Sequence, residues 1–305
     1  MSGLCYGCPM SVLVIGRSGQ LATELHRLAP SLGSPLPPSG TLDLADPQRL
    51  VAALEALRPS VILNAGAYTA VDRAEQEGER AFAVNAAGPG TLARWCAENG
   101  ASLIHVSTDY VFDGAKATPY EESDATGPLG VYGASKLAGE KAIAERLERH
   151  VILRTSWVFS ATGNNFVKTM LKLALQRDEL RVVADQHGKP TSAAELARVM
   201  LQLVEKLSEP GFPWGTYHFA CPESTTWHGF AQAIIDEQAS LTRRRPQVTP
   251  ITSAEYPTPA RRPANSVLSC RRFEEAFGLQ PRPWRDELPG IVRELVATSA
   301  RSYEP

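Results

Sequence analysis

Short apolar runs alternate with amphipathic segments through the first half of the chain. Short apolar runs bounded by turn-forming residues are typical of buried strands, whereas apolar positions that recur every three to four residues predict helices. The predicted strands cover residues 11–16, 60–67, 102–108 and 150–156, and the predicted helices cover residues 19–29, 46–57, 81–100 and 131–147. Strands that alternate with helices form parallel sheets covered on both faces. This half therefore predicts a doubly wound α/β domain.

Residues at the ends of these helices support the boundaries. Asp46 is a suitable N-cap and Pro47 a suitable first helical residue, while Gly100 can end the helix before it. The Gly-Pro-Gly at residues 88–90 predicts an interruption within the helix at 81–100.

The second half of the chain has a different pattern. Helices are predicted at residues 164–176, 192–207 and 225–239, and a strand at 215–221. Residues 243–266 are rich in proline, tyrosine and arginine. The segment is too polar and too often broken by proline for a core sheet, and its tyrosine and arginine residues argue against a simple linker. Two short helices are predicted to close the chain.

A chain of 305 residues suits two lobes better than one core. We expect a flexible leader at 1–9 and a nucleotide-binding domain at 10–160, to which residues 186–210 return. Residues 161–185 and 211–305 are expected to form a smaller mixed α/β lobe for the substrate.

Composition narrows the classes of function. The net charge of −2 gives no basic excess for nucleic acid or a membrane surface, and no apolar run approaches the roughly 20 residues of a membrane span. The N-terminal residues do not resemble a signal peptide, so we expect a cytoplasmic protein. The five scattered cysteines argue against a disulfide framework. Cys5 and Cys8 form a C-x-x-C without the second pair that a zinc site needs.

A glycine-rich turn follows the first predicted strand directly. Gly16, Gly19 and Ala22 form G-x-x-G-x-x-A, in which the glycines let the backbone approach a pyrophosphate and the helix N-terminus provides amide donors. After the first strand of an alternating α/β chain, this turn predicts dinucleotide binding in a Rossmann-type domain.

The identity of the dinucleotide depends on the ribose contacts. A typical NAD site has an acidic residue after the second strand of the nucleotide-binding unit, but the region expected to hold that strand, residues 31–44, contains three prolines and no acid before Asp43. Arg17 lies within the glycine turn, where it can meet a 2′-phosphate. We therefore expect NADPH, with NADH as the alternative.

Tyr132 and Lys136 are four residues apart on a predicted helix and share one face. Alone, this spacing also fits an ordinary solvated helix face. Thr108 adds a hydroxyl at a strand end, and Lys136 supplies a cation that can lower the pKa of the Tyr132 phenol. Together with the glycine turn, the three residues predict reduction of a carbonyl by a nicotinamide, with Tyr132 as the proton donor. His105 and His218 are interpreted as ordinary packed histidines.

Several longer strings carry a family resemblance. "STDYVFDG", "VYGASKLAGEKA", "RTSWVF", "GNNFVKTML" and "DQHGKPTSA" resemble the dTDP-4-dehydrorhamnose reductase family of the extended short-chain dehydrogenases/reductases. The resemblance covers about residues 11–288. Ala22 replaces the third glycine of the fingerprint, and the short, proline-rich region of the second strand departs from the family pattern.

The resemblance implies NADPH- or NADH-dependent reduction of the C4 ketone of dTDP-4-dehydro-L-rhamnose to dTDP-L-rhamnose. Lys136 would hold the nicotinamide ribose and Thr108 would orient the C4 oxygen. The remaining cofactor residues would be Gly16, Arg17, Ser18, Gly19, Gln20, Leu21, Asp43, Leu44, Ala65, Gly66, Ala67 and Tyr68. The substrate residues would be Ser107, Thr108, Asp109, Tyr110, Trp157, Asn164, Asn165, Arg261 and Arg262.

The resemblance also bears on metal binding and on the oligomeric state. Some members of the family bind Mg²⁺ through acidic residues at a dimer contact, and Glu24, Glu195 and Glu294 lie at roughly matching places. A homodimer is therefore a further expectation. No spacing of His, Cys and carboxylates indicates a catalytic metal.

Two rival functions remain at this point. One is an epimerase or dehydratase of the same superfamily, but a dehydratase needs an added carboxylate pair, and Asp109 has no glutamate beside it. The other is a non-catalytic, cofactor-binding regulatory subunit of the methionine adenosyltransferase type. The complete set of Thr108, Tyr132 and Lys136 favours the reductase.

Overall fold

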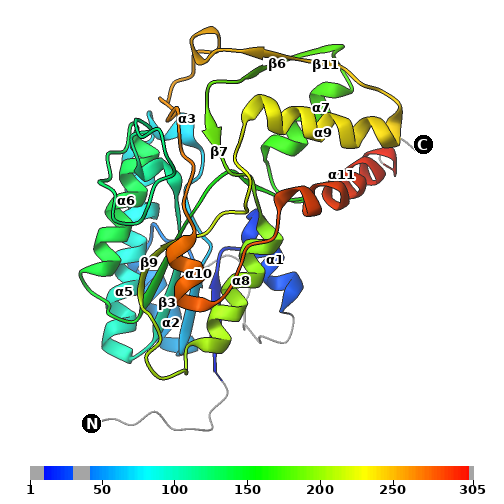
Figure 1. Cartoon of the computed structure of the whole chain (residues 1–305). Coiled ribbons are helices and arrows are strands. Elements are labelled where there is room, and N and C mark those ends of the chain that lie inside the picture. Colours follow the sequence, from blue (N-terminus) through cyan, green and yellow to red (C-terminus); the bar gives the residue numbers. More distant parts are fainter. Residues whose placement is uncertain (1–9, 30–41, 302–305) are drawn as a thin grey trace.

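The computed structural model describes residues 10–29 and 42–301 (Figure 1). The predicted leader at 1–9 and most of the predicted second-strand region therefore lie outside the described residues. Strands are β1 (Val12–Ile15), β2 (Val61–Asn64), β3 (Ser102–Thr108), β4 (His150–Thr155), β5 (Val158–Phe159), β6 (Glu179–Val183), β7 (His187–Gly188), β8 (Thr191–Ser192), β9 (Gly215–His218), β10 (Thr225–Thr226) and β11 (Gln247–Ile251).

Helices fill most of the intervals between these strands. The α-helices are α1 (Gln20–Leu28), α2 (Pro47–Leu57), α3 (Val71–Ala74), α4 (Gly78–Phe82), α5 (Gly88–Asn99), α6 (Val131–Ala144), α7 (Phe166–Ala174), α8 (Ala193–Lys206), α9 (Trp227–Thr242), α10 (Arg271–Phe277) and α11 (Trp284–Arg301). A π-helix η1 (Ala83–Ala87) and two 3₁₀ helices, η2 (Asp109–Val111) and η3 (Ser253–Glu255), complete the set.

A five-stranded parallel sheet lies at the centre of the fold. Its described strands run in the order β1-β2-β3-β4-β9. Side chains alternate between the two faces: Val12 and Val14 join one buried cluster, while Leu13 and Ile15 join the other. The predicted doubly wound α/β class is confirmed.

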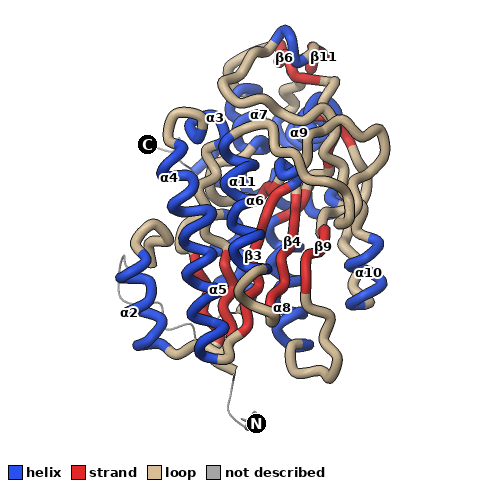
Figure 2. The backbone as a smooth tube through the Cα atoms, turned by 90° about the vertical axis from the view of Figure 1, so that its left-hand side faces the viewer, coloured by secondary structure: helices blue, strands red, loops and turns tan. Residues whose placement is uncertain are grey.

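Helices cover both faces of this sheet. Leu50 of α2, Leu92 of α5 and Ile143 of α6 pack on one face, which Figure 2 shows toward the viewer. Leu25 of α1 and Met200 of α8 pack on the other. Such two-sided burial explains why the strands read as continuous apolar runs.

The chain returns to the sheet once more than the sequence predicts. Residues 211–305 were expected to lie in the substrate lobe, but β9 pairs with β4, and Phe273 and Phe277 of α10 pack in the core beneath it. The predicted boundary at residue 210 is therefore wrong for β9 and α10. An edge strand of four residues is too short to be assigned to a sheet by pattern alone.

A second core holds the smaller lobe together. Helices α7, α9 and α11 pack around Phe230 and Trp284, beside the parallel pair β6–β11, at the upper right of Figure 1. The proline-rich segment contains β11, with Pro250 in a two-stranded sheet rather than in a core sheet. Among the described residues, no helix is both long and apolar enough to cross a membrane.

Two further predictions are wrong in detail. Gly-Pro-Gly does not interrupt a helix: Gly88 and Pro89 begin α5, and the irregular turn is η1, five residues earlier. The π-helix η1 runs directly into α5, with the Gly88 N–H donating to the Ala83 carbonyl oxygen, and Pro89 brings no N–H that would need a partner. The last helix is not short, since α11 runs for 18 residues with Pro289 inside it.

Candidate active site

A cavity of about 690 Å³ opens at the carboxyl ends of the central strands, where this fold class binds ligands. Turns after β1 and β2, the ends of β3 and β4, and α6 all contribute to its walls. It is lined by the predicted residues Gly16, Arg17, Ser18, Gly19, Gln20, Leu21, Ala65, Gly66, Ala67, Ser107, Thr108, Asp109, Tyr110, Tyr132, Lys136, Trp157 and Asn164.

The glycine turn presents backbone donors to one end of the cavity. Gly16 has a φ of +119°, and a Cβ there would lie 3.4 Å from the backbone of Ala65. Gly19 is the N-cap of α1, with no side chain over the helix end and no acidic residue in the first turn. An open N-terminus with its positive dipole suits a pyrophosphate.

Close backbone contacts fix helix α6 beside the cavity. A Cβ on Gly133 would lie 2.2 Å from the carbonyl oxygen of Tyr110, and a Cβ on Gly139 would lie 2.1 Å from that of Asn85. The Glu75 carboxylate accepts a hydrogen bond from the Val131 N–H at 2.9 Å, at the first turn of the helix. These contacts fix the position of α6 along its axis and its rotation about that axis, and they thereby place Tyr132 and Lys136 beside the cavity.

Lys136 is buried and its amine has two close neighbours. Nζ donates to the carbonyl oxygen of Val106 at 2.7 Å and lies 3.3 Å from Nε2 of His105. Burial lowers the pKa of Lys136 to about 8, and nearby Glu140 partly opposes this shift. Desolvation penalises the charged amine more than the neutral one.

Tyr132 keeps its proton at neutral pH. Its ring meets Tyr110 edge to face at a centroid distance of 5.8 Å. Burial raises the pKa of Tyr132 to about 12, while a hydrogen bond with Thr108 lowers it and Asp109 raises it. The expectation that Lys136 lowers this pKa is wrong for this structure, because the Lys136 amine is directed to His105 and Val106.

The end of β3 carries a buried acid beside Thr108. The Thr108 hydroxyl donates to Asp109 Oδ1 at 3.0 Å and accepts from the Tyr110 N–H at 3.2 Å. Burial raises the pKa of Asp109 to about 7, although neighbouring hydroxyls lower it. Asp109 Oδ2 and Thr155 Oγ1 are among the few buried polar atoms without a hydrogen-bond partner in the described part of the chain. Both residues line the cavity, as expected where a ligand completes the bonding.

Two tryptophans form the wall on the lobe side. Trp157 has a φ of +48°, in the left-handed region that bulky residues rarely adopt. Its indole stacks on Trp227, at the start of α9, with a centroid distance of 3.6 Å. A Cβ on Gly188 would lie 2.3 Å from the Trp157 ring, so this glycine makes room for it. Strain of this kind is characteristic of functional sites.

Some predicted residues act next to the cavity rather than in its wall. Asn165 caps α7 and donates to Gln20 Oε1 at 2.9 Å, so it positions a lining residue. Leu44 is buried against Gly66, and the exposed Asp43 accepts from the Ala45 N–H. The Tyr68 hydroxyl bonds Glu77 at 2.8 Å, away from the cavity.

The two predicted diphosphate partners lie on the proline-rich segment. Arg262 makes a two-point ion pair with Asp72 of α3, at 2.8 and 3.1 Å, and this hydrogen bonding lowers the pKa of Asp72. Arg262 is thus already paired with a carboxylate in this structure, and its diphosphate contact stays a prediction. Arg261 borders a small pocket beside Tyr110 and Tyr132. In Figure 1 the orange segment after β11 passes α3 on its way to α10.

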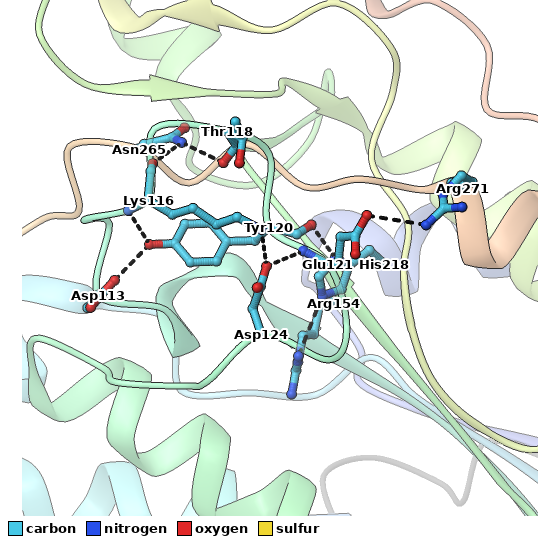
Figure 3. A network of polar contacts seen from close by, with 10 residues as sticks. All are labelled: Asp113, Lys116, Thr118, Tyr120, Glu121, Asp124, Arg154, His218, Asn265 and Arg271. Atoms are coloured by element: carbon cyan, nitrogen blue, oxygen red, sulfur yellow. Dashed lines mark hydrogen bonds and ion pairs between the residues drawn. The ribbon is translucent and has the colours of Figure 1, made fainter.

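A polar network fastens the segment after β3 to this returning chain (Figure 3). Tyr120 donates to Asp113 at 2.7 Å, and the Lys116 ammonium contacts Asp124 at 2.6 Å. The Asn265 amide donates to the Lys116 carbonyl oxygen at 2.7 Å. The Asn265 amide thus joins two segments that are more than 140 residues apart in sequence.

Sequence reasoning missed nine residues of the cavity wall, because most are small or apolar and carry no catalytic pattern. They are Thr69, Val71, Val106, Thr155, Ser156, Val158, Gly163, Leu196 and Trp227. Strand-end position could have indicated Thr155 and Ser156, but no signal placed Trp227 beside Trp157.

Within the described residues of a single chain, the three predicted metal ligands do not come together in one cluster. Glu24 pairs with Arg27 at 2.7 Å, and Glu195 pairs with Arg198 at 2.5 Å. Glu294 lies exposed on α11. Within residues 10–29 and 42–301, no group of three or more His, Cys, Asp or Glu side chains could hold an ion.

Comparison with known proteins identifies the family. The family model described as the RmlD substrate binding domain matches residues 10–297. The dTDP-4-dehydrorhamnose reductase of Burkholderia thailandensis is 42% identical over 94% of this chain and 100% of its own. The crystal structure of a dTDP-4-dehydrorhamnose reductase from Clostridium acetobutylicum matches with a TM-score of 0.86 and 36% identity, covering 94% of this chain and 100% of that one. The Bacillus anthracis enzyme, solved in complex with NADP, matches with a TM-score of 0.84 and 34% identity over 93% and 98%.

Proposed function

The chain belongs to the dTDP-4-dehydrorhamnose reductase family, and on this basis we propose that its cavity reduces the C4 ketone of dTDP-4-dehydro-L-rhamnose. The family consists of NAD(P)H-dependent oxidoreductases of dTDP-L-rhamnose biosynthesis. The observation that carries the proposal is the convergence of Thr108, Tyr132 and Lys136 on one cavity that begins at the glycine turn.

The residues of the cavity fit a nicotinamide cofactor, which would supply the hydride. Gly16 and Gly19 with the N-terminus of α1 would hold its pyrophosphate, and Lys136 its ribose. At neutral pH the protonated Tyr132 phenol would donate its proton to the C4 oxygen, while Thr108 orients that oxygen. Trp157 and Trp227 would form the apolar wall against the sugar ring.

The direct test is the reaction itself. Purified protein with dTDP-4-dehydro-L-rhamnose and NADPH should lose absorbance at 340 nm with equimolar formation of dTDP-L-rhamnose. An epimerase or dehydratase would leave the amount of reduced cofactor unchanged. A regulatory subunit would bind the cofactor without turnover, so either result would refute the proposal.

Arg17 provides the prediction for cofactor choice. We propose NADPH as the preferred donor, because Arg17 lies in the glycine turn and lines the cavity. Arg17→Ala should raise the KM for NADPH by roughly tenfold through loss of a charged phosphate contact, and should leave the KM for NADH unchanged. Arg49→Ala, an exposed arginine on α2, is the matched control. A wild-type preference for NADH would refute the role of Arg17.

Gly188 provides the prediction for the sugar wall. In Gly188→Ala the new methyl group would overlap the indole of Trp157 and displace it from Trp227. The KM for the sugar substrate should rise by about 10-fold to 10²-fold, because misplaced binding groups weaken productive binding. The Kd of NADPH should stay unchanged.

Gly290→Ala is the control for this variant, since a Cβ there meets nothing within 4 Å. A Gly188→Ala protein with wild-type KM for the sugar would show that Trp157 does not contact the substrate.

The remaining expectations stay proposals. We propose that the predicted substrate lobe of residues 161–185 and 211–305, without β9 and α10, forms around the separate apolar core of α7, α9 and α11. Homodimerisation, a Mg²⁺ requirement and a cytoplasmic location remain predictions of the sequence. The arginine partners of Glu24 and Glu195 weigh against Mg²⁺ at those carboxylates.

A further inference from the structure

A buried row of polar groups runs from the cavity wall to Lys136. The Gly66 N–H donates to Asn64 Oδ1 at 3.1 Å, and Asn64 Nδ2 lies 2.9 Å from His105 Nδ1. His105 Nε2 in turn lies 3.3 Å from Lys136 Nζ. Asn64 and His105 are completely buried, at 0% exposure, so no solvent can replace a missing partner.

The Gly66 N–H at one end of the row determines which group donates and which accepts in each of the following hydrogen bonds. Because the Gly66 N–H can only donate, the Asn64 oxygen must face it, and the Asn64 NH₂ must then donate to His105 Nδ1. A neutral histidine that accepts at Nδ1 carries its proton on Nε2. Burial holds the pKa of His105 well below its usual value, so the ring is neutral.

Lys136 therefore faces one acceptor and one donor. The Val106 carbonyl oxygen accepts from Nζ at 2.7 Å, whereas the His105 Nε2–H is directed at Nζ. A neutral amine has both a donor and a lone pair and matches this pair of neighbours. An ammonium group has three donors and no acceptor, so it opposes the His105 N–H.

We propose that Asn64 and His105 form a relay that favours the neutral amine of Lys136 and couples its protonation to the Gly66 N–H in the cavity wall. When Lys136 takes one proton from solvent, His105 keeps its single proton but carries it on Nδ1. The Asn64 amide then turns its oxygen to His105 and its NH₂ to Gly66. The Gly66 N–H loses its acceptor and becomes available to an acceptor in the cavity.

The relay links cofactor binding to proton uptake. Gly66 lines the cavity on the side proposed for the cofactor, so an acceptor bound there would favour the protonated state of Lys136. Of the other ionisable groups, Glu140 on α6 acts on Lys136, His150 of β4 acts on His105, and Tyr132 lies one turn before Lys136 on α6. These three residues are unaltered in the variants described below. The relevance of the relay to catalysis rests on the proposed role of Lys136, but the titration of Lys136 can be measured without turnover.

The decisive variant is Asn64→Leu, which is uncharged, similar in size and not in contact with Lys136. It removes the group that holds His105 Nδ1 as an acceptor, so the tautomer can follow the charge on Lys136. The pKa of Lys136, measured by NMR of ¹³C,¹⁵N-lysine in the full chain, should rise from about 8 by about 0.5–1 unit, equivalent to one net hydrogen bond. Lys136→Arg assigns the resonance among the seven lysines.

Two histidine variants test the other link. His105→Leu removes the donor that faces Lys136 and should give the same upward shift, even if Asn64→Leu does not fold. In His105→Gln the amide can accept from Asn64 and donate toward Lys136, so the pKa should stay near the wild-type value. His218→Gln, another buried histidine, contacts Arg154 instead and should leave the Lys136 titration unchanged.

Calorimetry of NADP⁺ binding to the wild-type protein provides the second readout. In two buffers of different ionisation enthalpy at about pH 8.5, binding should take up a large fraction of one proton per site. In Asn64→Leu, whose Lys136 is already about half to three-quarters protonated at this pH, uptake should fall. Unchanged Lys136 titration in both Asn64→Leu and His105→Leu, or no proton uptake in the wild type, would overturn the relay. Neither result would bear on whether the enzyme reduces the sugar.

Discussion

Tyr132→Phe is expected to lower kcat by about 10²-fold or more, with little change in the Kd of NADPH. The phenol is protonated at neutral pH because burial raises its pKa to about 12, and it lies beside Thr108 in the cavity wall. Removing the hydroxyl removes the proposed acid, while the ring that packs on Tyr110 remains. Steady-state rates and fluorescence titration with NADPH measure the two effects separately.

Tyr256→Phe is the matched control, because this tyrosine is 60% exposed and lies outside the cavity wall. Its kcat should equal that of the wild type. If Tyr132→Phe kept a normal rate, the proton would have to come from another group. Asp109 would then be the strongest alternative, since burial raises its pKa to about 7, and Asp109→Asn would carry the loss instead.

Arg154→Met is expected to lower the free energy of unfolding by about 3–5 kcal/mol. The Arg154 guanidinium contacts both carboxylate oxygens of Glu140, at 2.7 and 3.1 Å, and both side chains are less than 10% exposed. Without arginine, the Glu140 charge stays buried and unpaired. Figure 3 shows Arg154 beside His218, at the inner end of the network around Tyr120. Urea denaturation followed by circular dichroism measures the loss.

A double variant separates the ion pair from simple packing. Arg154→Met with Glu140→Gln removes both charges but keeps an oxygen for the Ser107 hydroxyl, which donates to Glu140 at 2.5 Å. It should recover most of the lost stability, because the cost arises from the unpaired charge. A double variant as unstable as Arg154→Met, or a single variant as stable as the wild type, would contradict this interpretation.

The Glu140–Arg154 pair also lies close to the proposed catalytic groups in the chain. Ser107 precedes Thr108 at the end of β3, and Glu140 lies one turn beyond Lys136 on α6. The Glu140–Arg154 pair therefore joins the strand and the helix that carry the proposed catalytic groups to β4.

Local features of the sequence predicted most of the central architecture and brought together the residues of the proposed catalytic set. Apolar periodicity, caps and glycines act within a few residues, so β1–β4 and α6 could be predicted from short windows. The glycine turn and the Tyr132–Lys136 spacing are likewise local, because a strand-to-helix turn and one helical turn fix their geometry. Position at a strand end was enough to bring Thr108 to the same edge of the sheet.

Contacts between distant segments could not be predicted in this way. Trp157 meets Trp227, Arg262 pairs with Asp72, and β9 joins β4 only through the packing of complete elements. From the sequence, His105 was interpreted as an ordinary packed histidine. Its polar neighbours Asn64 and Lys136 come from another strand and from a helix, so short sequence windows could not indicate them. The sequence by itself determined which chemical groups this protein has and which strand or helix carries them. Only the tertiary structure decided the partners of those groups, because burial removes water and leaves each polar atom to whatever the packing places beside it.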